Sequence, residues 1–221
     1  MEYHNPVLLK ETVAGLNIKP DGIYVDVTFG GGGHTRAILE GHPQNSVTAI
    51  DCDPEAAPRA EALKKEFGSR FTFVDGFFDE LGHKVTDSFT GILLDLGVSS
   101  FQLDTPGRGF SFRADAEADM RLNPREGVPA WKFIEQSDTE TLTTVVRDYA
   151  EEPRYRAIVQ ALEKAKGTPE LRTTLGLSKI ISYHVRGHRT IHPATRVFMG
   201  LRMAVNREVE RLTAALPWAF G

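Results

Sequence analysis

The sequence predicts an α/β fold built around a parallel β-sheet. Four short apolar runs, each bounded by turn residues, have the length of buried strands and cover residues 23–27, 47–50, 71–74 and 91–94. Segments of helical character lie between them at residues 34–39 and 54–67, with a looser one near 78–85. Strands that alternate with helices in this way are typical of βαβ units, which place their strands parallel in one sheet.

Acidic residues follow three of these four runs directly. Asp51, Asp75 and Asp95 each come at the end of a buried run. In open α/β sheets the ligand crevice lies outside the carboxyl ends of the strands. The sequence therefore predicts a ligand site at that edge of the sheet, with these carboxylates beside it.

The character of the chain changes after Gln102. Residues 104–131 are rich in Arg, Asp, Gly and Pro and show little periodicity, as expected of a functional loop. A helical pattern follows as far as Ser182, with breaks at Pro153 and at Gly167. We therefore expect a helical region here rather than more sheet.

The last element is predicted to be one amphipathic helix. From Pro193 to Pro217 apolar residues recur every three or four positions, which places them on one helix face. We accordingly divide the chain into three parts, residues 1–104, residues 105–192, and residues 193–221, the last being a helix that returns to the first part.

Composition bounds the environment of the protein. The single cysteine, Cys52, excludes an internal disulfide and fits a reducing compartment. No apolar run approaches the roughly 20 residues that a membrane-spanning helix needs. The histidines do not form a set with metal-ligand spacing, so we expect no metal site. These observations predict a cytoplasmic protein without a membrane partner.

The net charge of −4 hides a basic stretch. Residues 182–211 contain six arginines and two acidic residues and carry +4, whereas the rest of the chain carries −8. A local basic face on an acidic protein fits phosphate contact, although a solvated helix face is an equally good interpretation from charge alone.

A run of four glycines, Gly30 to Gly33, connects the first predicted strand to the first helix. Glycine lets the backbone turn sharply and approach a ligand, and the N–H groups at the start of the following helix then point at that ligand. The loop ends Gly-His34-Thr and therefore lacks the lysine of a phosphate-binding P-loop. Arg36 stands where a dinucleotide fingerprint needs its third glycine, which disfavours a nicotinamide-dependent oxidoreductase. Asp26, just before the loop, suits the methyltransferase variant, in which an acid faces the loop and the amino group of a bound methionine moiety.

An acid about 20 residues beyond such a loop commonly binds ribose hydroxyls. Asp53 precedes Pro54 and a helix, so it is most simply a helix cap, which leaves Asp51 for the ribose. Phe78 follows the third strand and has two interpretations, stacking on adenine or core packing, and we expect one of the neighbours Phe77 and Phe78 to belong to the core.

Several motifs occur in one order along nearly the whole chain. They are His4-Asn5-Pro6-Val7-Leu8-Leu9, Asp26-x-Thr28-Phe29 with the four glycines and His34, Leu94-Asp95-Leu96-Gly97-Val98-Ser99-Ser100-x-Gln102, Arg108-Gly109-Phe110-Ser111-Phe112, Asp119-Met120-Arg121 and His192-Pro193-Ala194-Thr195-Arg196. Together they resemble the bacterial 16S rRNA (cytidine-N4) methyltransferase H family, also called MraW.

The resemblance implies a class I S-adenosylmethionine (SAM)-dependent methyltransferase with a Rossmann-like core and an inserted all-α domain. Residues 1–104 would then bind SAM and residues 105–192 the substrate, a cytidine in small-subunit rRNA or in the assembled subunit. The family's SAM contacts carry over to Gly32, Gly33, His34, Asp51, Phe78, Asp95 and Gln102.

Asp95 is also the candidate catalytic residue. A carboxylate that accepts a hydrogen bond from the cytosine N4–H would stabilise the charge that develops on nitrogen during methyl transfer. Amino-methyltransferases often carry a Pro-Pro-aromatic sequence after this residue, whereas Leu-Gly-Val follows Asp95 here. Contact with the cofactor alone is an equally good interpretation of Asp95.

Two groups of residues are candidates for RNA contact. Arg108, Phe110 and Arg113 combine aromatic and basic side chains in one loop, which suits base stacking and phosphate contact, and a packed lid is the alternative. Arg186, Arg189 and Arg196 belong to the basic stretch and are the second group. His192 is expected to form a hydrogen bond at a helix start.

The sequence departs from the family at the sheet, and also at Ala150, which stands where the family has a glycine. We predict four strands, fewer than the family's full core, which would leave the Asp95 strand at a sheet edge. A shortened chain, a naturally short relative and a homodimer that completes the sheet are three explanations. An alternative function follows: a catalytically weak module that binds SAM or RNA.

Overall fold

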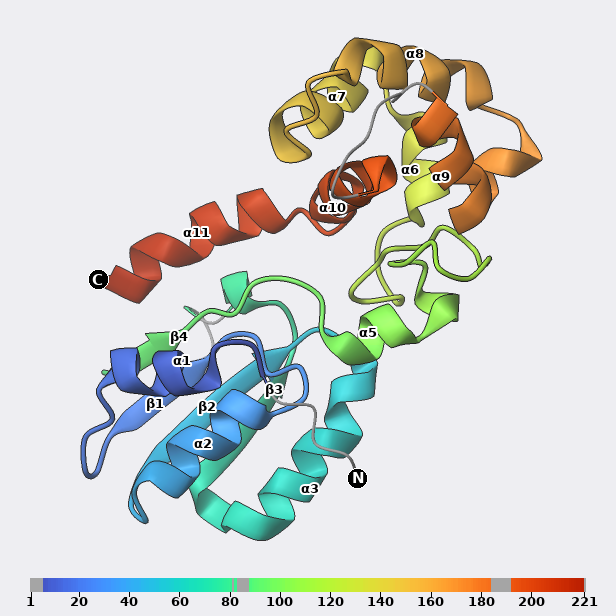
Figure 1. Ribbon diagram of the computed structural model, residues 1–221. Helices are drawn as coiled ribbons and strands as arrows, with labels where there is room; N and C mark the ends of the chain where they lie inside the picture. Colours follow the sequence, from blue (N-terminus) through green and yellow to red (C-terminus); the bar gives the residue numbers. More distant parts are fainter. Residues whose placement is uncertain (1–5, 81, 83–87, 184–191, 221) are drawn as a thin grey trace. The chain divides into compact units, whose positions relative to one another are not determined.

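The computed structural model describes residues 6–80, 82, 88–183 and 192–220. The chain divides into two compact units (Figure 1). The first unit combines Met1–Ser99 with Glu210–Gly221, and the second is Ser100–Val209.

The first unit contains a parallel sheet of four strands in the order β3-β2-β1-β4. The strands are β1 (Ile23–Asp26), β2 (Ser46–Asp51), β3 (Phe71–Asp75) and β4 (Gly91–Leu93). All four were predicted from the sequence and are confirmed. The strand β1 pairs with a neighbour on both sides. Its Tyr24 lies opposite Val47 of β2 and Gly91 of β4.

Both faces of this sheet are buried, which explains why the strands read as continuous apolar runs. Successive strand residues point to opposite faces, so Tyr24 and Val25 belong to different clusters. Tyr24 packs with residues of α2 (Gly33–Gly41) and α3 (Ala57–Phe67), which lie over one face (Figure 1). On the other face, Trp218 of α11 (Glu208–Phe220) packs against the cluster that contains Val25.

Shorter elements complete this unit. They are α1 (Leu9–Leu16), η1 (Pro54–Ala56), η2 (Gly68–Arg70) and η3 (Phe78–Glu80). The predicted cap is confirmed in η1, where the Asp53 carboxylate accepts a hydrogen bond from the Glu55 N–H at 3.0 Å. The helix α1 was not predicted, and it has no fully buried residue that could have produced an apolar pattern.

The second unit is helical, as predicted. It contains α5 (Ser100–Asp104), η4 (Pro106–Arg108), α6 (Ala130–Gln136), α7 (Thr139–Thr144), the π-helical turn η5 (Val145–Tyr149), α8 (Tyr155–Ala165), η6 (Pro169–Arg172), α9 (Thr174–Tyr183) and α10 (Pro193–Val205). The chain leaves helical structure at Pro153 and Gly167 as expected. A further break precedes α7, where the Asp138 carboxylate caps the Thr141 N–H at 2.8 Å.

The prediction of a single helix from Pro193 to Pro217 is wrong. Two helices, α10 and α11, replace it, and Arg207 between them has a left-handed φ of 53°. The Asn206 side chain bonds the Leu122 N–H and the Met120 carbonyl at 2.7 and 2.8 Å, which holds the chain in the break. Pro217 does not end α11, which continues to Phe220.

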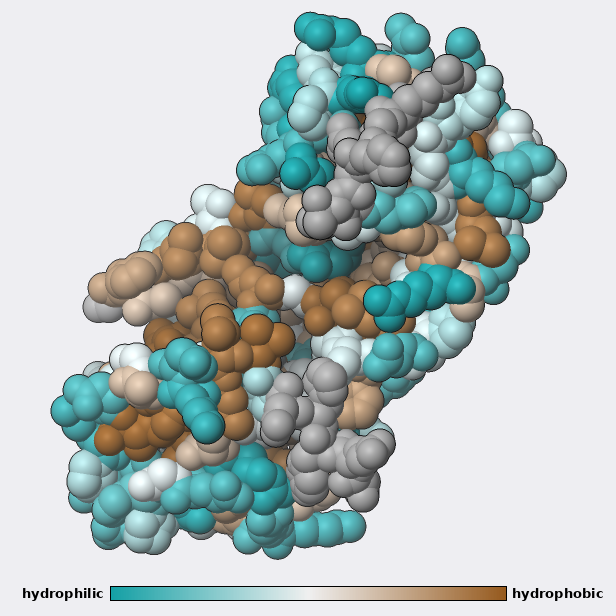
Figure 2. Space-filling view, in the orientation of Figure 1, coloured by the Kyte–Doolittle hydropathy of each residue, from teal (hydrophilic) through white to brown (hydrophobic). Residues whose placement is uncertain are grey.

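Apolar residues remain exposed along α11. Val209, Leu216 and Phe220 are 37%, 37% and 88% exposed, and Figure 2 shows hydrophobic residues gathered along this helix. Among the described residues, no helix is long and apolar enough to cross a membrane.

Candidate functional site

The loop between β1 and α2 has a shape that requires glycine. Gly30 and Gly32 have φ values of 51° and 77°, in the left-handed region that other residues rarely adopt. A Cβ at Gly32 would lie 2.8 Å from the Phe29 ring, and one at Gly33 would lie 2.3 Å from the Pro6 ring. Glycine at these two positions therefore lets the loop backbone pack closely against the Phe29 and Pro6 rings. The loop leads directly into the N-terminus of α2, whose first N–H groups can meet a ligand.

The Asp26 side chain forms hydrogen bonds to residues on both sides of this loop. Its carboxylate is fully buried and accepts hydrogen bonds from the Thr28 N–H at 3.1 Å and from the Thr35 hydroxyl at 2.6 Å. Burial raises the pKa of Asp26, and these two donors oppose that shift. The sequence predicts that Asp26 faces the loop and the amino group of a bound methionine moiety, and in the structure its oxygens bind Thr28 in the loop and Thr35 in α2.

Asp51 lies at the end of β2 and connects the glycine loop to the next loop. One of its oxygens accepts the Gly30 N–H at 2.7 Å, and the other accepts the Asp53 N–H at 2.9 Å. Burial raises the pKa of Asp51 to about 6, against the effect of these two hydrogen bonds. Each carboxylate oxygen has a second acceptor position, which leaves capacity for two hydroxyl groups of a ligand.

Asp95 follows β4 and lies against the same loop. Its N–H donates to the Thr28 hydroxyl at 2.8 Å, and its side chain is 52% exposed. The His34 Nδ1 lies 3.7 Å from the nearer Asp95 oxygen, and the His34 side chain is only 7% exposed. The carboxyl ends of β1, β2 and β4 thus bring three of the predicted residues together, His34, Asp51 and Asp95.

Phe78 and Gln102 are the remaining predicted cofactor contacts. Phe78 is half-buried and packs beside the cluster of Val25, Val27 and Ile50, whereas its neighbour Phe77 is buried. The expectation that one of the two phenylalanines is core is confirmed for Phe77. Gln102 is buried in α5 and belongs to the second unit, so the structure of the first unit does not include it.

Comparison with known proteins identifies the family to which this chain belongs. A profile of the MraW methylase family matches residues 1–221. The chain belongs to the MraW methylase family. Proteins called ribosomal RNA small subunit methyltransferase H match it at 43% identity in Cyanothece sp., 41% in Buchnera aphidicola and 44% in Hydrogenovibrio crunogenus. These alignments cover 95%, 96% and 96% of the chain and 70%, 69% and 69% of the relatives.

A solved structure of an rRNA methylase from Streptococcus thermophilus shares 25% sequence identity over 37% of this chain and 49% of that one, with a TM-score of 0.32. As an MraW methylase, the protein is a methyltransferase that uses SAM as its methyl donor. The residues present fit that cofactor. The glycine loop leads into the N-terminus of α2, where N–H groups can meet its carboxylate, and Asp51 keeps acceptor positions for its ribose.

The loop residues predicted to contact RNA differ in exposure. Arg108 and Phe110 are each 7% exposed, and the Arg108 guanidinium donates to the carbonyls of Arg121 and Leu122 at 3.1 and 2.8 Å. This burial gives Arg108 and Phe110 the packing role that was the alternative interpretation. Arg113, in the same loop, is exposed.

Some arginines in the basic stretch of this MraW methylase form ion pairs within the protein. Arg202 and Arg211 are paired with Glu208 and Asp79 at 2.7 Å each. Arg196 is exposed and donates to the Glu151 carbonyl at 3.1 Å. Arg186 and Arg189 lie outside the described residues. The His192 prediction is confirmed, since its Nδ1 accepts the Ala194 N–H at 3.2 Å and caps α10.

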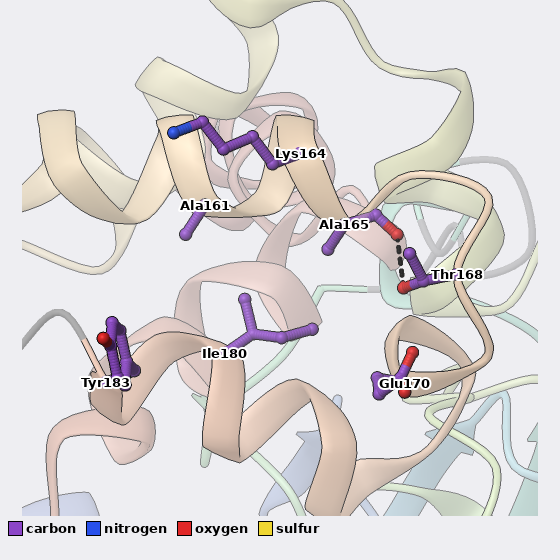
Figure 3. Close-up of a pocket in the computed structure, with 7 residues that line it drawn as sticks. All are labelled: Ala161, Lys164, Ala165, Thr168, Glu170, Ile180 and Tyr183. Carbon is purple, nitrogen blue, oxygen red and sulfur yellow. Dashed lines mark hydrogen bonds between the residues drawn. The ribbon is translucent and has the colours of Figure 1, made fainter.

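A hollow of about 330 Å³ lies on the second unit between α8 and α9 (Figure 3). Its lining residues are Ala161, Lys164, Ala165, Thr168, Glu170, Ile180 and Tyr183. The Thr168 hydroxyl there donates to the Ala165 carbonyl at 2.7 Å. None of the residues predicted for chemistry is among them, so we assign this hollow no ligand.

Proposed function

We propose that this protein transfers the methyl group of SAM to the N4 amine of a cytidine in small-subunit rRNA, in the cytoplasm. The observation that carries the proposal is the meeting of the glycine loop, Asp51 and Asp95 in a chain of the MraW methylase family. The names of the relatives, which state an action on small-subunit rRNA, support the choice of substrate.

The predicted cofactor residues are proposed to contact different parts of SAM. Asp51 accepts hydrogen bonds from the ribose, Gly32, Gly33 and His34 offer the backbone of the loop, and Phe78 stacks on the adenine. The half-exposed ring of Phe78 beside the sheet supports the stacking. We retain Gln102, from the second unit, as a cofactor contact on the resemblance to the family.

Asp95 performs the catalytic task in this proposal. Bound SAM supplies an electrophilic methyl group, so the protein has mainly to position the target amine for in-line attack. The lone pair of the cytosine N4 is conjugated into the ring, and a carboxylate that accepts the N4–H helps to localise it. The exposure of the Asp95 side chain beside the glycine loop supports this role.

RNA contact in the proposal rests on exposed arginines of the second unit. Arg113 and Arg196 are exposed, and Arg186 and Arg189 are retained from the basic stretch. Arg108 and Phe110 are left out of the RNA contacts because they are buried. The target base must leave any stack to reach the methyl group, and exposed basic side chains would hold the surrounding backbone.

Transfer of labelled methyl from SAM tests the function. Unmodified small subunits, naked rRNA and intact ribosomes are offered in parallel, and the product is identified by nucleoside analysis. We expect label on cytidine N4 in the small subunit or its rRNA. SAM binding without transfer to any of the three would favour the alternative, a catalytically weak binding module.

A homodimer is a further part of the proposal. Among the described strands, β4 has one neighbour, β1, and therefore forms a sheet edge beside Asp95. An exposed edge favours pairing with another strand. Analytical ultracentrifugation measures the oligomeric state. If it finds only monomer over the concentration range of the assay, the dimer is ruled out.

A further inference from the structure

The buried imidazole of His34 has one polar neighbour and one unmatched nitrogen. His34 is the second residue of α2, and its Nδ1 faces an Asp95 oxygen at 3.7 Å. Its Nε2 is buried and has no hydrogen-bond partner among the described residues. A residue that served only to pack would not need a polar ring in this place.

These surroundings select one form of the ring. A proton on Nε2 would leave a buried N–H without an acceptor, which is more costly than an unused acceptor nitrogen. The tautomer with its proton on Nδ1 avoids this cost, and Nδ1 is the nitrogen that faces Asp95.

We propose that His34 is a positioning residue that donates its Nδ1–H to Asp95 and so orients this carboxylate toward the target amine. The inference rests on the proposed function and adds a residue that acts through Asp95. In the reaction, the N4 lone pair forms the bond to the methyl carbon while the carbon–sulfur bond breaks and its electron pair goes to sulfur. The amine then loses a proton, for which Asp95 is the acceptor.

Asp95 needs such a partner because little else holds its side chain. Its backbone N–H is fixed by the Thr28 hydroxyl, but half of the side chain is exposed. The separation of 3.7 Å exceeds a hydrogen bond, and rotation of the Asp95 side chain closes it when the substrate binds. Within the part of the chain that the structure describes, two titratable groups face Asp95, namely His34 and the buried Asp26, which interacts with both.

Three substitutions separate this role from simple packing. His34→Asn keeps an amide N–H near the Nδ1 position, whereas His34→Gln places its amide nearer to Nε2 and His34→Ala has no donor. We expect the Gln and Ala variants to lose about 10- to 100-fold in kcat, as is typical when a group that orients a catalytic ligand is removed. Their Kd for SAM should stay within about threefold, and His34→Asn should recover most of the lost kcat.

The pH profile of kcat/KM is a readout that packing alone would not change. We expect the acidic limb of this profile to move in His34→Gln and to stay in place in His34→Asn, because only the Asn amide keeps a donor on the side of Asp95. Unchanged kcat and an unmoved limb in His34→Gln would overturn the inference. Equal loss of SAM binding in all three variants would also overturn it, because His34 would then serve the cofactor.

A measurement without turnover keeps this test separate from that of the proposed function. The ¹⁵N chemical shifts of the His34 ring identify the protonated nitrogen in the wild-type protein. We expect the proton on Nδ1, and a proton on Nε2 would contradict the inference even if the enzyme is active. Absence of methyl transfer by the wild-type protein, with the proton on Nδ1, would instead count against the proposed function alone.

Discussion

Asp51 is a carboxylate that the fold both buries and supplies with donors. Burial raises its pKa to about 6, and the N–H groups of Gly30 and Asp53 partly counteract that effect. Ribose hydroxyls donate hydrogen bonds, so they favour the ionised form of this group. In the proposed complex, cofactor binding is therefore coupled to the loss of a proton from Asp51.

The affinity for SAM should consequently depend on pH. Above about pH 7 Asp51 is ionised and binding is at its full strength, whereas below about pH 6 protonation competes and affinity falls by up to about tenfold per pH unit. Asp51→Asn should weaken binding about 10- to 100-fold at pH 7.5, the loss expected for hydrogen bonds to a charged group, and should flatten this dependence. Isothermal titration calorimetry from pH 5 to 8 measures both effects.

Asp53→Asn is the matched control for this experiment. Asn caps a helix as well as Asp does, so this variant should bind SAM like the wild-type protein. A pH dependence that persists in Asp51→Asn would show that another group controls the affinity.

Contacts of different sequence separation explain which site residues the sequence could reveal. The Asp53 cap spans two residues and was predicted from Pro54 alone. The bond from Gly30 to Asp51 spans 21 residues and was reached through known spacing in α/β folds. Two contacts of Asp95, with His34 and with Thr28, depend on how β4 pairs with β1. No local sequence pattern indicates such contacts.

At the scale of elements, α11 is attached to the first unit by Arg211. The guanidinium contacts both oxygens of Asp79 at 2.7 and 3.0 Å and lies 3.4 Å from the centre of the Phe77 ring. Both charged side chains are less than a quarter exposed, at 17% and 24%. This pair is thus better shielded from water than an ordinary surface ion pair.

Removal of this attachment should destabilise the protein. Arg211→Ala leaves Asp79 partly buried without its partner, and we expect a loss of about 2 kcal/mol in the free energy of unfolding. Urea denaturation measures the change, and a double-mutant cycle with Asp79→Ala should give a coupling energy of about 1 kcal/mol or more. Asp148→Ala removes a partner from the exposed Arg147 pair and should cost much less than Arg211→Ala, because water screens that pair. Equal losses in the two single variants would contradict the assigned difference.

Local sequence patterns predicted the elements unevenly. The four strands were found because both sheet faces are buried and their apolar runs are uninterrupted. The break between α10 and α11 was missed because Asn206 makes it through bonds to residues 84 and 86 positions away. Apolar periodicity reports the buried face of a helix and carries no information about such a distant partner.

At the scale of the whole molecule, charge is distributed less simply than its sequence suggests. Of the six arginines in residues 182–211, Arg202 and Arg211 serve internal ion pairs. A basic stretch in the sequence is therefore not equivalent to a basic surface. The arginines proposed for RNA contact are Arg113, Arg186, Arg189 and Arg196.

Replacement of Arg186, Arg189 and Arg196 by Ala should weaken RNA binding and reduce its salt dependence. Each lost phosphate contact lowers the slope of log K against log salt by about 0.7 for single strands and about 0.9 for duplexes. The triple variant should thus lose about two units of slope or more, as measured by fluorescence anisotropy over a range of salt concentrations. Lys65→Ala, which removes an exposed charge of α3, should leave the slope unchanged. The same slope in the triple variant and the wild-type protein would exclude these arginines from phosphate contact.

The packing of Trp218 against the sheet has a consequence for the order in which the protein folds during synthesis. The second unit is continuous in sequence, whereas the first includes residues that follow Val209. While the ribosome is still making those residues, the side of the sheet that carries Val25 and Ile50 has no Trp218 to cover it. We therefore expect the unit that begins the chain to be the later of the two to reach its native core, the reverse of the usual N-terminal-first sequence.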